Sequence, residues 1–169
     1  WTLCSPDMGT NAVLDRWRQT QPKALIAVDG VFYAGKALDR SAALAEILAQ
    51  LPCIETVYLV PSDCAVRTMP DAVDFAAATA RDDAAVAGFE PAMLPFDHPL
   101  WILYSSGTTG LPKAIVHGHG GVILATAAGR LHFDLGPSYA PNTIGERFHW
   151  YSASGWVMWN IQIGGLLSG

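Results

Sequence analysis

The sequence has few basic residues and no cluster of them. Its 169 residues include 10 Lys and Arg against 15 Asp and Glu, which gives a formal net charge of −5. Non-specific binding to nucleic acid depends on Lys and Arg side chains gathered in a patch that neutralises phosphates. The sequence therefore predicts a protein that does not bind nucleic acid.

Cysteines are also few, and long apolar runs are missing. Cys4, Cys53 and Cys64 are odd in number and form no CxxC pair, so neither disulfides nor a zinc site are expected. Free thiols are typical of a reducing compartment. No apolar run reaches the roughly 20 residues that a transmembrane helix needs, and no signal peptide is visible. These absences predict a cytoplasmic protein without a transmembrane segment.

Apolar residues, by contrast, are plentiful. Hydrophobic residues make up 51% of the chain and charged residues only 15%, which is a high apolar content for a free-standing domain of this size. The sequence begins at Trp1 rather than at a methionine, and its last residues, 161–169, are mostly apolar. We therefore expect these residues to be a fragment of a larger domain.

Local patterns predict helices that alternate with strands, as in an α/β fold of mixed sheets with covering helices. Residues 71–88 are expected to form a surface helix or loop, and 136–145 a loop. The expected helices lie at about 7–19, 39–50 and 121–130 and from 156 onwards, and the expected strands lie at 23–28, 31–33, 55–60, 100–103, 114–117 and 146–151.

Several acidic residues in the first half stand at expected turns and helix starts. Ser5 or Asp7 is expected to cap the first helix, and the Asp29-Gly30 pair predicts a hairpin turn between the first two strands. Asp29, Asp39 and Asp63 are therefore interpreted as turn and cap residues rather than as acid–base groups.

The most informative stretch connects the expected strands at 100–103 and 114–117. Hydroxyl side chains can donate hydrogen bonds to an anion there, and glycines allow main-chain N–H groups to converge on it. A lysine adds a mobile positive charge suited to phosphate oxygens. An ordinary Ser/Gly-rich surface loop is the alternative. The residues expected to hold phosphate are Ser105, Ser106, Gly107, Thr108, Thr109, Gly110 and Lys113.

A phosphate-binding loop of the Walker type is a further alternative. In that motif a helix begins directly at the lysine and its N-terminus holds the phosphate. Here Pro112 precedes Lys113, and residues 114–117 favour a strand. The loop is therefore expected to join two strands, and a P-loop NTPase is not expected.

The stretch from Tyr104 to Lys113 resembles the signature loop of the adenylate-forming superfamily, which includes acyl-CoA synthetases, luciferases and the adenylation domains of peptide synthetases. Its flanks, 97–102 and 114–121, resemble in particular the acetoacetate–CoA ligases of that superfamily, as do 35–40 and 155–160. Ala114 stands where most members have glycine, and the acetoacetate branch commonly has alanine there. The resemblance implies that residues 1–169 are part of one AMP-binding domain, the large N-terminal domain, without the C-terminal lid.

The resemblance also implies an activity. Members of the family condense a carboxylate with ATP to give acyl-AMP and pyrophosphate, and the CoA thiolate then displaces AMP. ATP, Mg²⁺ and CoA are the implied cofactors, and acetoacetate is the implied small-molecule partner. Acetate, propionate or another short acid is the alternative substrate, and a truncated, non-catalytic nucleotide-binding module is the alternative class of protein.

Site residues follow from the same resemblance. The loop would hold the β- and γ-phosphates, and Gly155 and Trp156 would lie at the carboxylate pocket, although Trp156 and Trp159 are equally well explained as a packed aromatic pair. The histidines are assigned structural roles, and no catalytic residue or metal ligand is expected in the chain. The acidic Mg²⁺ ligand, the ribose aspartate, the lid lysine and the CoA channel are all missing, so the fragment alone is expected to be inactive.

Overall fold

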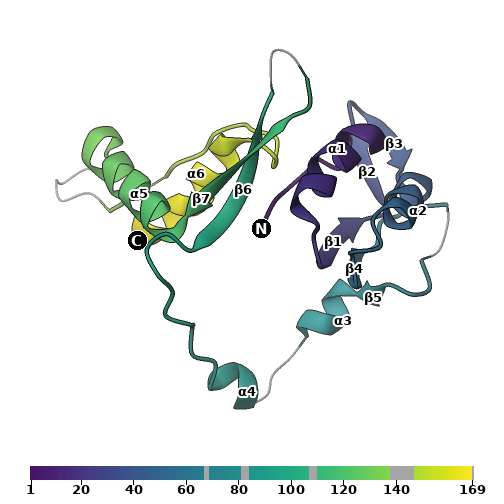
Figure 1. Ribbon diagram of the computed structural model, residues 1–169, viewed down its shortest axis with the longest axis horizontal. Coiled ribbons are helices and arrows are strands. Elements are labelled where there is room, and N and C mark those ends of the chain that lie inside the picture. The colour runs from purple at the N-terminus through teal and green to yellow at the C-terminus, as the bar shows by residue number, and fades with distance from the viewer. Residues whose placement is uncertain (67–68, 81–83, 107–109, 138–146, 169) are drawn as a thin grey trace. The chain divides into compact units, whose positions relative to one another are not determined.

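The computed structural model describes residues 1–66, 69–80, 84–106, 110–137 and 147–168 (Figure 1). The chain divides into two compact units. One unit is Pro6–Ala92, and the other combines Trp1–Ser5 with Met93–Gly169. The two units are described separately, and together they contain the mixture of helices, parallel strands and antiparallel strands that the sequence predicts.

The Pro6–Ala92 unit contains a parallel sheet of order β1-β4-β5, an antiparallel hairpin of β2 and β3, and two main helices that contact each other. Its core consists of apolar side chains of α1, α2 and β1, among them Leu14, Leu25, Leu44 and Ile47. The elements are α1 (Thr10–Thr20), β1 (Ala24–Val28), β2 (Gly30–Tyr33), β3 (Lys36–Asp39), α2 (Ser41–Gln50), β4 (Thr56–Val60), β5 (Val73–Asp74), α3 (Phe75–Thr79) and α4 (Ala84–Ala87).

The start of α1 differs from the prediction. The helix begins at Thr10 with Gly9 as its N-cap, so neither Ser5 nor Asp7 is the N-cap residue that the sequence predicted. Residues 6–8 form a turn before the extended Gly9 instead. The predicted end is confirmed, because Gln21 adopts a left-handed conformation and Pro22 follows.

The Asp29-Gly30 pair is not a hairpin turn, because β1 pairs in parallel with β4 and not with β2. The observed hairpin turn lies at Ala34 and Gly35, both at positive φ. The buried Asp29 carboxylate accepts a hydrogen bond from the Ser62 N–H at 2.7 Å. Asp29 therefore fixes a loop that follows β4, which fits its interpretation as a structural residue.

Asp39 has a similar structural role at the start of α2. Its Oδ1 accepts hydrogen bonds from the main-chain N–H of Ser41 at 2.9 Å and from the Ser41 hydroxyl at 2.6 Å. The expected helix at 39–50 is confirmed from Ser41 onwards. Of the four residues expected to face inward, Leu44, Ile47 and Leu51 are buried and Leu48 is partly buried. These contacts support the interpretation of Asp39 as a cap-type residue.

The unit that contains Met93–Gly169 is built on the antiparallel pair of β6 (Pro99–Ser105) and β7 (Lys113–Gly118). Trp101 and Leu103 of β6 form its small core together with Val122 of α5 (His119–Phe133). Helix α6 (Val157–Gly165) contacts α5, and the 3₁₀ helix η1 (Leu166–Ser168) follows it.

The N-terminal residues lie along β6. The Ile102 N–H donates to the Trp1 carbonyl at 2.7 Å, and the Trp1 amino group donates to the Leu100 carbonyl at 2.8 Å. Thr2 forms a parallel bridge with Ile102. The Trp1 and Trp101 rings lie 5.7 Å apart between centroids. The first residues of the chain therefore add a short parallel neighbour to β6.

One prediction for the last third is wrong. The expected strand at 146–151 is absent over the described residues 147–151, where the main chain of Trp150 bonds to the side chain of Gln162 instead of to a neighbouring strand. Helix α5 contains the expected helix at about 121–130 and extends past it at both ends, from His119 to Phe133. Most of the expected loop at 136–145 lies outside the described residues. Across the described part of the chain, no helix has both the length and the apolar character that a membrane span requires.

Candidate functional site

The predicted phosphate loop connects β6 to β7 at the turn end of their hairpin. Ser105, the last residue of β6, pairs with Lys113, the first residue of β7, so the intervening residues must reverse the chain. Ser105, Ser106, Gly110 and Lys113 are all exposed to solvent. Gly107, Thr108 and Thr109 lie outside the described residues. The described part of the loop thus presents hydroxyl groups and an ammonium group where a solute can reach them.

Strand β6 has a clear physical reason to stop at the loop. Trp101 and Leu103 alternate into the core, whereas the sequence from Ser105 onwards has no apolar side chain to bury until Leu111. The strand after the loop is confirmed, because β7 begins at Lys113 itself and α5 begins only at His119. A helix directly after the lysine is excluded, so the loop is not of the Walker type.

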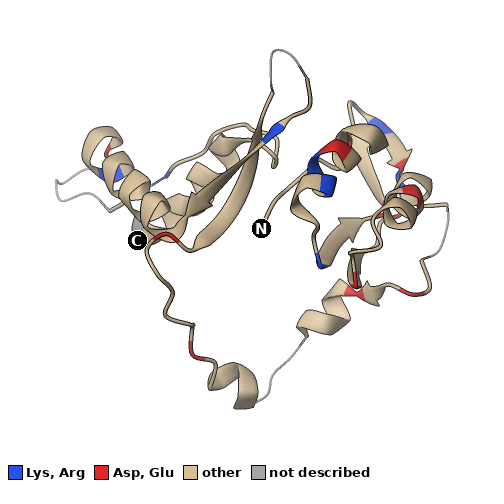
Figure 2. Cartoon of the chain, in the orientation of Figure 1, with Lys and Arg blue, Asp and Glu red and all other residues tan. Residues whose placement is uncertain are grey.

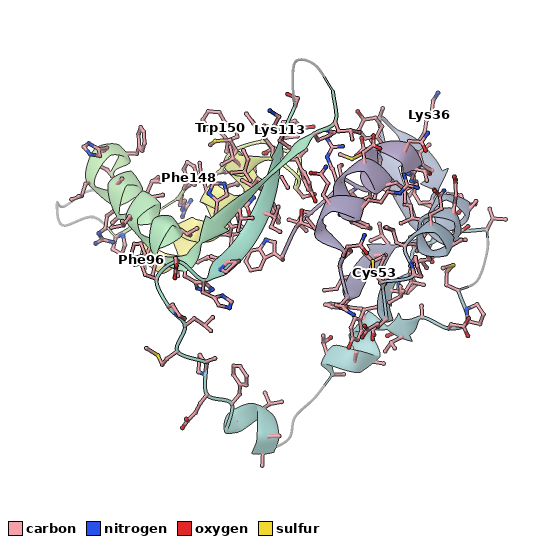
Figure 3. The ribbon with its side chains drawn as sticks, viewed as in Figure 1. Lys36, Cys53, Phe96, Lys113, Phe148 and Trp150 are labelled. Atoms are coloured by element: carbon pink, nitrogen blue, oxygen red, sulfur yellow. The ribbon has the colours of Figure 1, made fainter. Side chains whose placement is uncertain are left out.

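Charge on this hairpin has one sign. Within the described residues of β6, β7 and their connection, Lys113 is the one charged side chain, and no carboxylate accompanies it (Figure 2). The hairpin of Figure 3 carries Lys113 at the start of β7. An exposed ammonium without an acidic neighbour on its own hairpin is available to bind an anion from solution.

The second predicted region is the turn before α6. The Trp156 N–H donates to the Ala153 carbonyl at 3.1 Å, which closes the turn around Ser154 and Gly155. Trp156 is the N-cap of α6 rather than a residue of its first turn. Its side chain is 54% exposed and that of Trp159 is 36% exposed, so neither belongs to the described core.

The turn packs against the N-terminal segment at Gly155. A Cβ atom at this position would lie 3.1 Å from the carbonyl oxygen of Leu3, so a larger residue would push the two backbones apart. Thr2, the residue before Leu3, pairs in parallel with Ile102 of β6. The turn therefore contacts the N-terminal segment one residue away from its bridge to β6, within the same unit as the loop.

Sequence reasoning missed the residue that holds the segment before this turn. Gln162 of α6 donates from Nε2 to the Trp150 carbonyl at 2.7 Å and accepts at Oε1 from the Trp150 N–H at 3.1 Å. A signal was present, because Gln162 is a polar residue between Ile161 and Ile163 in an apolar helix. Periodicity alone could not identify its partner twelve residues earlier.

Asn160 was also missed. Its side chain is 1% exposed, and its Nδ2 donates to the Trp156 carbonyl at a long 3.4 Å. Its Oδ1 has no hydrogen-bond partner among the described residues. Asn160 therefore links the body of α6 back to Trp156, its N-cap residue, through one long hydrogen bond.

Three of the five histidines lie in aromatic contacts. His98 and His119 stack edge to face at 5.7 Å between ring centroids, and His117 lies 6.3 Å from the Trp101 ring. Across the described ranges, no group of three or more His, Cys, Asp or Glu side chains is placed to hold a metal ion. The structural interpretation of the histidines agrees with these contacts.

Comparison with known proteins identifies a family that matches this chain and proteins of similar sequence. Residues 2–169 match the family described as "AMP-binding enzyme". Acetoacetyl-CoA synthetase of Gallus gallus is 37% identical over 177 residues, and acetoacetyl-coenzyme A synthetase of Rhizobium meliloti (strain 1021) is 39% identical over 172 residues. Each alignment covers 100% of this chain and 25% of the relative, so the chain spans about a quarter of the length of the curated relatives it matches.

Solved structures agree with these sequence relatives. Acetoacetyl-CoA synthetase from Streptomyces lividans has a TM-score of 0.85 and 44% sequence identity to this chain, and the match covers 100% of this chain and 24% of that one. A luciferase-like enzyme from the mealworm Zophobas morio matches 76% of this chain and 26% of its own with a TM-score of 0.58. At 17% identity the second match concerns the fold alone.

Proposed function

The chain belongs to the family of AMP-binding enzymes, and from this we propose that it is part of an AMP-forming acid–thiol ligase whose acid is acetoacetate. The relatives that support this substrate are named acetoacetyl-CoA synthetases, and three of them are 37–44% identical to the chain over its whole length. We further propose that the 169 residues form one part of a single adenylation domain, without the C-terminal lid, in a cytoplasmic enzyme.

The proposed reaction has two steps. A carboxylate oxygen of acetoacetate attacks the α-phosphorus of ATP, the bond to the β-phosphate breaks, and pyrophosphate leaves. The thiolate of CoA then attacks the carbonyl carbon of the acyl-adenylate, and AMP leaves. Negative charge accumulates on the departing pyrophosphate in the first step, so fixed donors around the β- and γ-phosphates lower the barrier.

The residues proposed to supply these donors are those of the loop, from Ser105 to Lys113. The single observation that carries the proposal is the hairpin geometry: Ser105 pairs directly with Lys113, and the described hairpin holds no carboxylate to neutralise the lysine. Hydroxyl groups and one ammonium at the end of a strand pair suit the oxygens of a polyphosphate.

Gly155 and Trp156 are proposed to border the carboxylate pocket. Their turn lies in the same unit as the loop, and Gly155 approaches Leu3, the residue after Thr2, which pairs with Ile102 of β6. An exposed indole at the N-cap of α6 provides a rigid apolar wall for a small acid.

ATP and CoA are proposed as substrates and Mg²⁺ as the ion that accompanies ATP. Mg²⁺ is usually held by one or two carboxylates together with substrate phosphates. The described residues hold no group of three or more metal-ligating side chains. What this chain contributes to ATP is hydrogen bonds and one positive charge.

The test is acid-dependent exchange of labelled pyrophosphate into ATP by the full-length protein that contains this chain. We expect exchange with acetoacetate to be faster than with acetate or propionate, and we expect acetoacetyl-CoA to form when CoA is added. Faster exchange with acetate or propionate would assign the enzyme to another short acid. Binding of ATP with no acid-dependent exchange would instead indicate a non-catalytic nucleotide-binding module.

A further inference from the structure

One side chain, that of Gln162, bonds to both polar groups of the Trp150 main chain. The Gln162 amide donates to the Trp150 carbonyl at 2.7 Å and accepts from the Trp150 N–H at 3.1 Å. A β-strand neighbour would make the same pair of bonds. The side-chain amide therefore substitutes for a strand partner along a segment that has no strand of its own.

This double hydrogen bond fixes one end of the segment before α6. Residues 147–153 carry no helix or strand, and the Trp150 side chain, labelled in Figure 3, is 48% exposed, so apolar burial holds this residue only in part. The other end is fixed where Gly155 packs against the Leu3 carbonyl. The Ser152–Trp156 turn lies between the helix side chain and the N-terminal segment, and its position depends on both.

We propose that Gln162 is a positioning residue of the carboxylate pocket, because it sets where the turn that carries Gly155 and Trp156 begins. This inference rests on the function proposed above for Gly155 and Trp156. Gln162 bonds to Trp150 and not to the β6–β7 hairpin, so its influence on the phosphate loop is expected to be small. Loss of its amide therefore raises the KM for acetoacetate and leaves the KM for ATP nearly unchanged.

The test compares variants of the full-length protein that contains this chain. Gln162→Leu keeps the approximate size of the side chain and removes both hydrogen bonds to Trp150. Gln162→Glu keeps an acceptor for the Trp150 N–H and loses the donor to the Trp150 carbonyl. Gln19→Leu is the matched control, because Gln19 is an exposed helical glutamine of α1 whose amide donates to the Asp15 carbonyl within its own helix.

The expected result is that the KM for acetoacetate changes much more than the KM for ATP. For Gln162→Leu we expect the KM for acetoacetate to rise about tenfold, because displacement of positioning groups by a fraction of an ångström to 1 Å commonly has effects of this size or larger. The KM for ATP is expected to change less than about twofold. Gln162→Glu is also expected to raise the KM for acetoacetate, because its second carboxylate oxygen faces the Trp150 carbonyl with no proton to donate. Gln19→Leu is expected to cause no rise.

A purely structural role for Gln162 predicts a different result. It would lower the thermal midpoint and raise the KM for ATP and for acetoacetate together, and that outcome overturns the inference. An unchanged KM for acetoacetate in Gln162→Leu overturns it as well. Absence of acetoacetate-dependent exchange in the wild-type protein overturns the proposed function and, with it, the inference that rests on it.

Amide hydrogen exchange reports on the Gln162–Trp150 contact without a measurement of activity. It therefore distinguishes failure of this inference from failure of the proposed function. The amide of Trp150 is expected to exchange slowly in the wild-type protein and clearly faster in Gln162→Leu, measured on a peptide that covers residues 147–156. Faster exchange together with an unchanged KM for acetoacetate would show that the contact exists and that the pocket does not depend on it. In that case only the inference fails, and the proposed ligase activity stands.

Discussion

Gly120 lies directly against the Phe96 side chain. A Cβ atom on Gly120 would be 2.1 Å from Cδ2 of the Phe96 ring, and the Gly120 N–H donates to the Phe96 carbonyl at 2.8 Å. The first turn of α5 is thereby joined to the segment that leads into β6 (Figure 3). The segment and the helix can approach this closely only because the helix residue has no side chain.

Substitution of Gly120 is therefore expected to destabilise the protein. Gly120→Ala would force the 65% exposed Phe96 ring aside, and we expect a loss of about 1 kcal/mol in the free energy of unfolding, the lower end of the range for overpacking. The neighbouring Gly121 is the control, since no atom lies within 4 Å of a Cβ there. Gly121→Ala is expected to be neutral or to stabilise by up to about 1 kcal/mol through helix propensity. Urea unfolding of both variants would measure the difference, and equal midpoints would contradict the expectation.

Lys113 is expected to matter for ATP and not for stability. Its side chain is exposed at the start of β7, so Lys113→Met should leave the thermal midpoint close to that of the wild type. Loss of its charge should lower the rate of pyrophosphate exchange by roughly 10²- to 10³-fold, the usual effect of removing one stabilising group from a charged transition state. Lys113→Arg should retain more activity than Lys113→Met. Equal rates for wild type and Lys113→Met would show that Lys113 is not part of the phosphate site.

Trp156 is expected to determine which acids are used. Trp156→Ala should lower kcat/KM for acetoacetate by about tenfold or more, because a large apolar wall is lost, and should raise kcat/KM for longer linear acids relative to acetoacetate. Pyrophosphate exchange measured with a series of acids would test this. Phe133→Ala, which alters an exposed aromatic residue of α5, should leave the order of acids unchanged. An unchanged order in Trp156→Ala would favour the view that Trp156 serves packing.

The 169-residue polypeptide by itself is expected to be inactive. It contains the proposed phosphate loop and part of the proposed carboxylate pocket, and the described residues hold no cluster of metal-ligating side chains. A coupled assay of pyrophosphate release with acetoacetate, ATP and CoA should therefore give no signal above the background of ATP hydrolysis. Sustained turnover by these residues alone would contradict the expectation and would mean that the remaining parts of the relatives are dispensable.

The β6–β7 hairpin was predictable because the relevant signals are local. Trp101 and Leu103 alternate with less buried residues, the loop between the strands is rich in small residues, and Pro112 disfavours a helix start at Lys113. Strand, loop and return strand follow from these residues without knowledge of the rest of the fold. The order of elements around the loop is confirmed for the same reason.

The failed predictions depend on partners that are distant in the sequence. Asp29-Gly30 has the composition of a hairpin turn, but β1 pairs with β4, and Asp29 bonds to Ser62. Residues 147–151 have the composition of a strand, but the side chain of Gln162 takes the main-chain bonds of Trp150. In the first case a distant strand, and in the second a side-chain amide, takes the place of the expected neighbouring strand, and sequence periodicity reports neither.

The pairing of Trp1 and Thr2 with β6 also has a consequence for the order of folding. The Trp1 amino group bonds to the Leu100 carbonyl across a sequence separation of 99 residues, and the whole Pro6–Ala92 unit lies within that separation. Closing so long a loop costs conformational entropy before the contact contributes any favourable free energy. We expect the β6–β7 hairpin, whose contacts are local, to form early, and the first residues of the chain to dock onto β6 late. A newly made chain would thus hold Trp1 and Thr2 unpaired until residues about a hundred positions later had been folded.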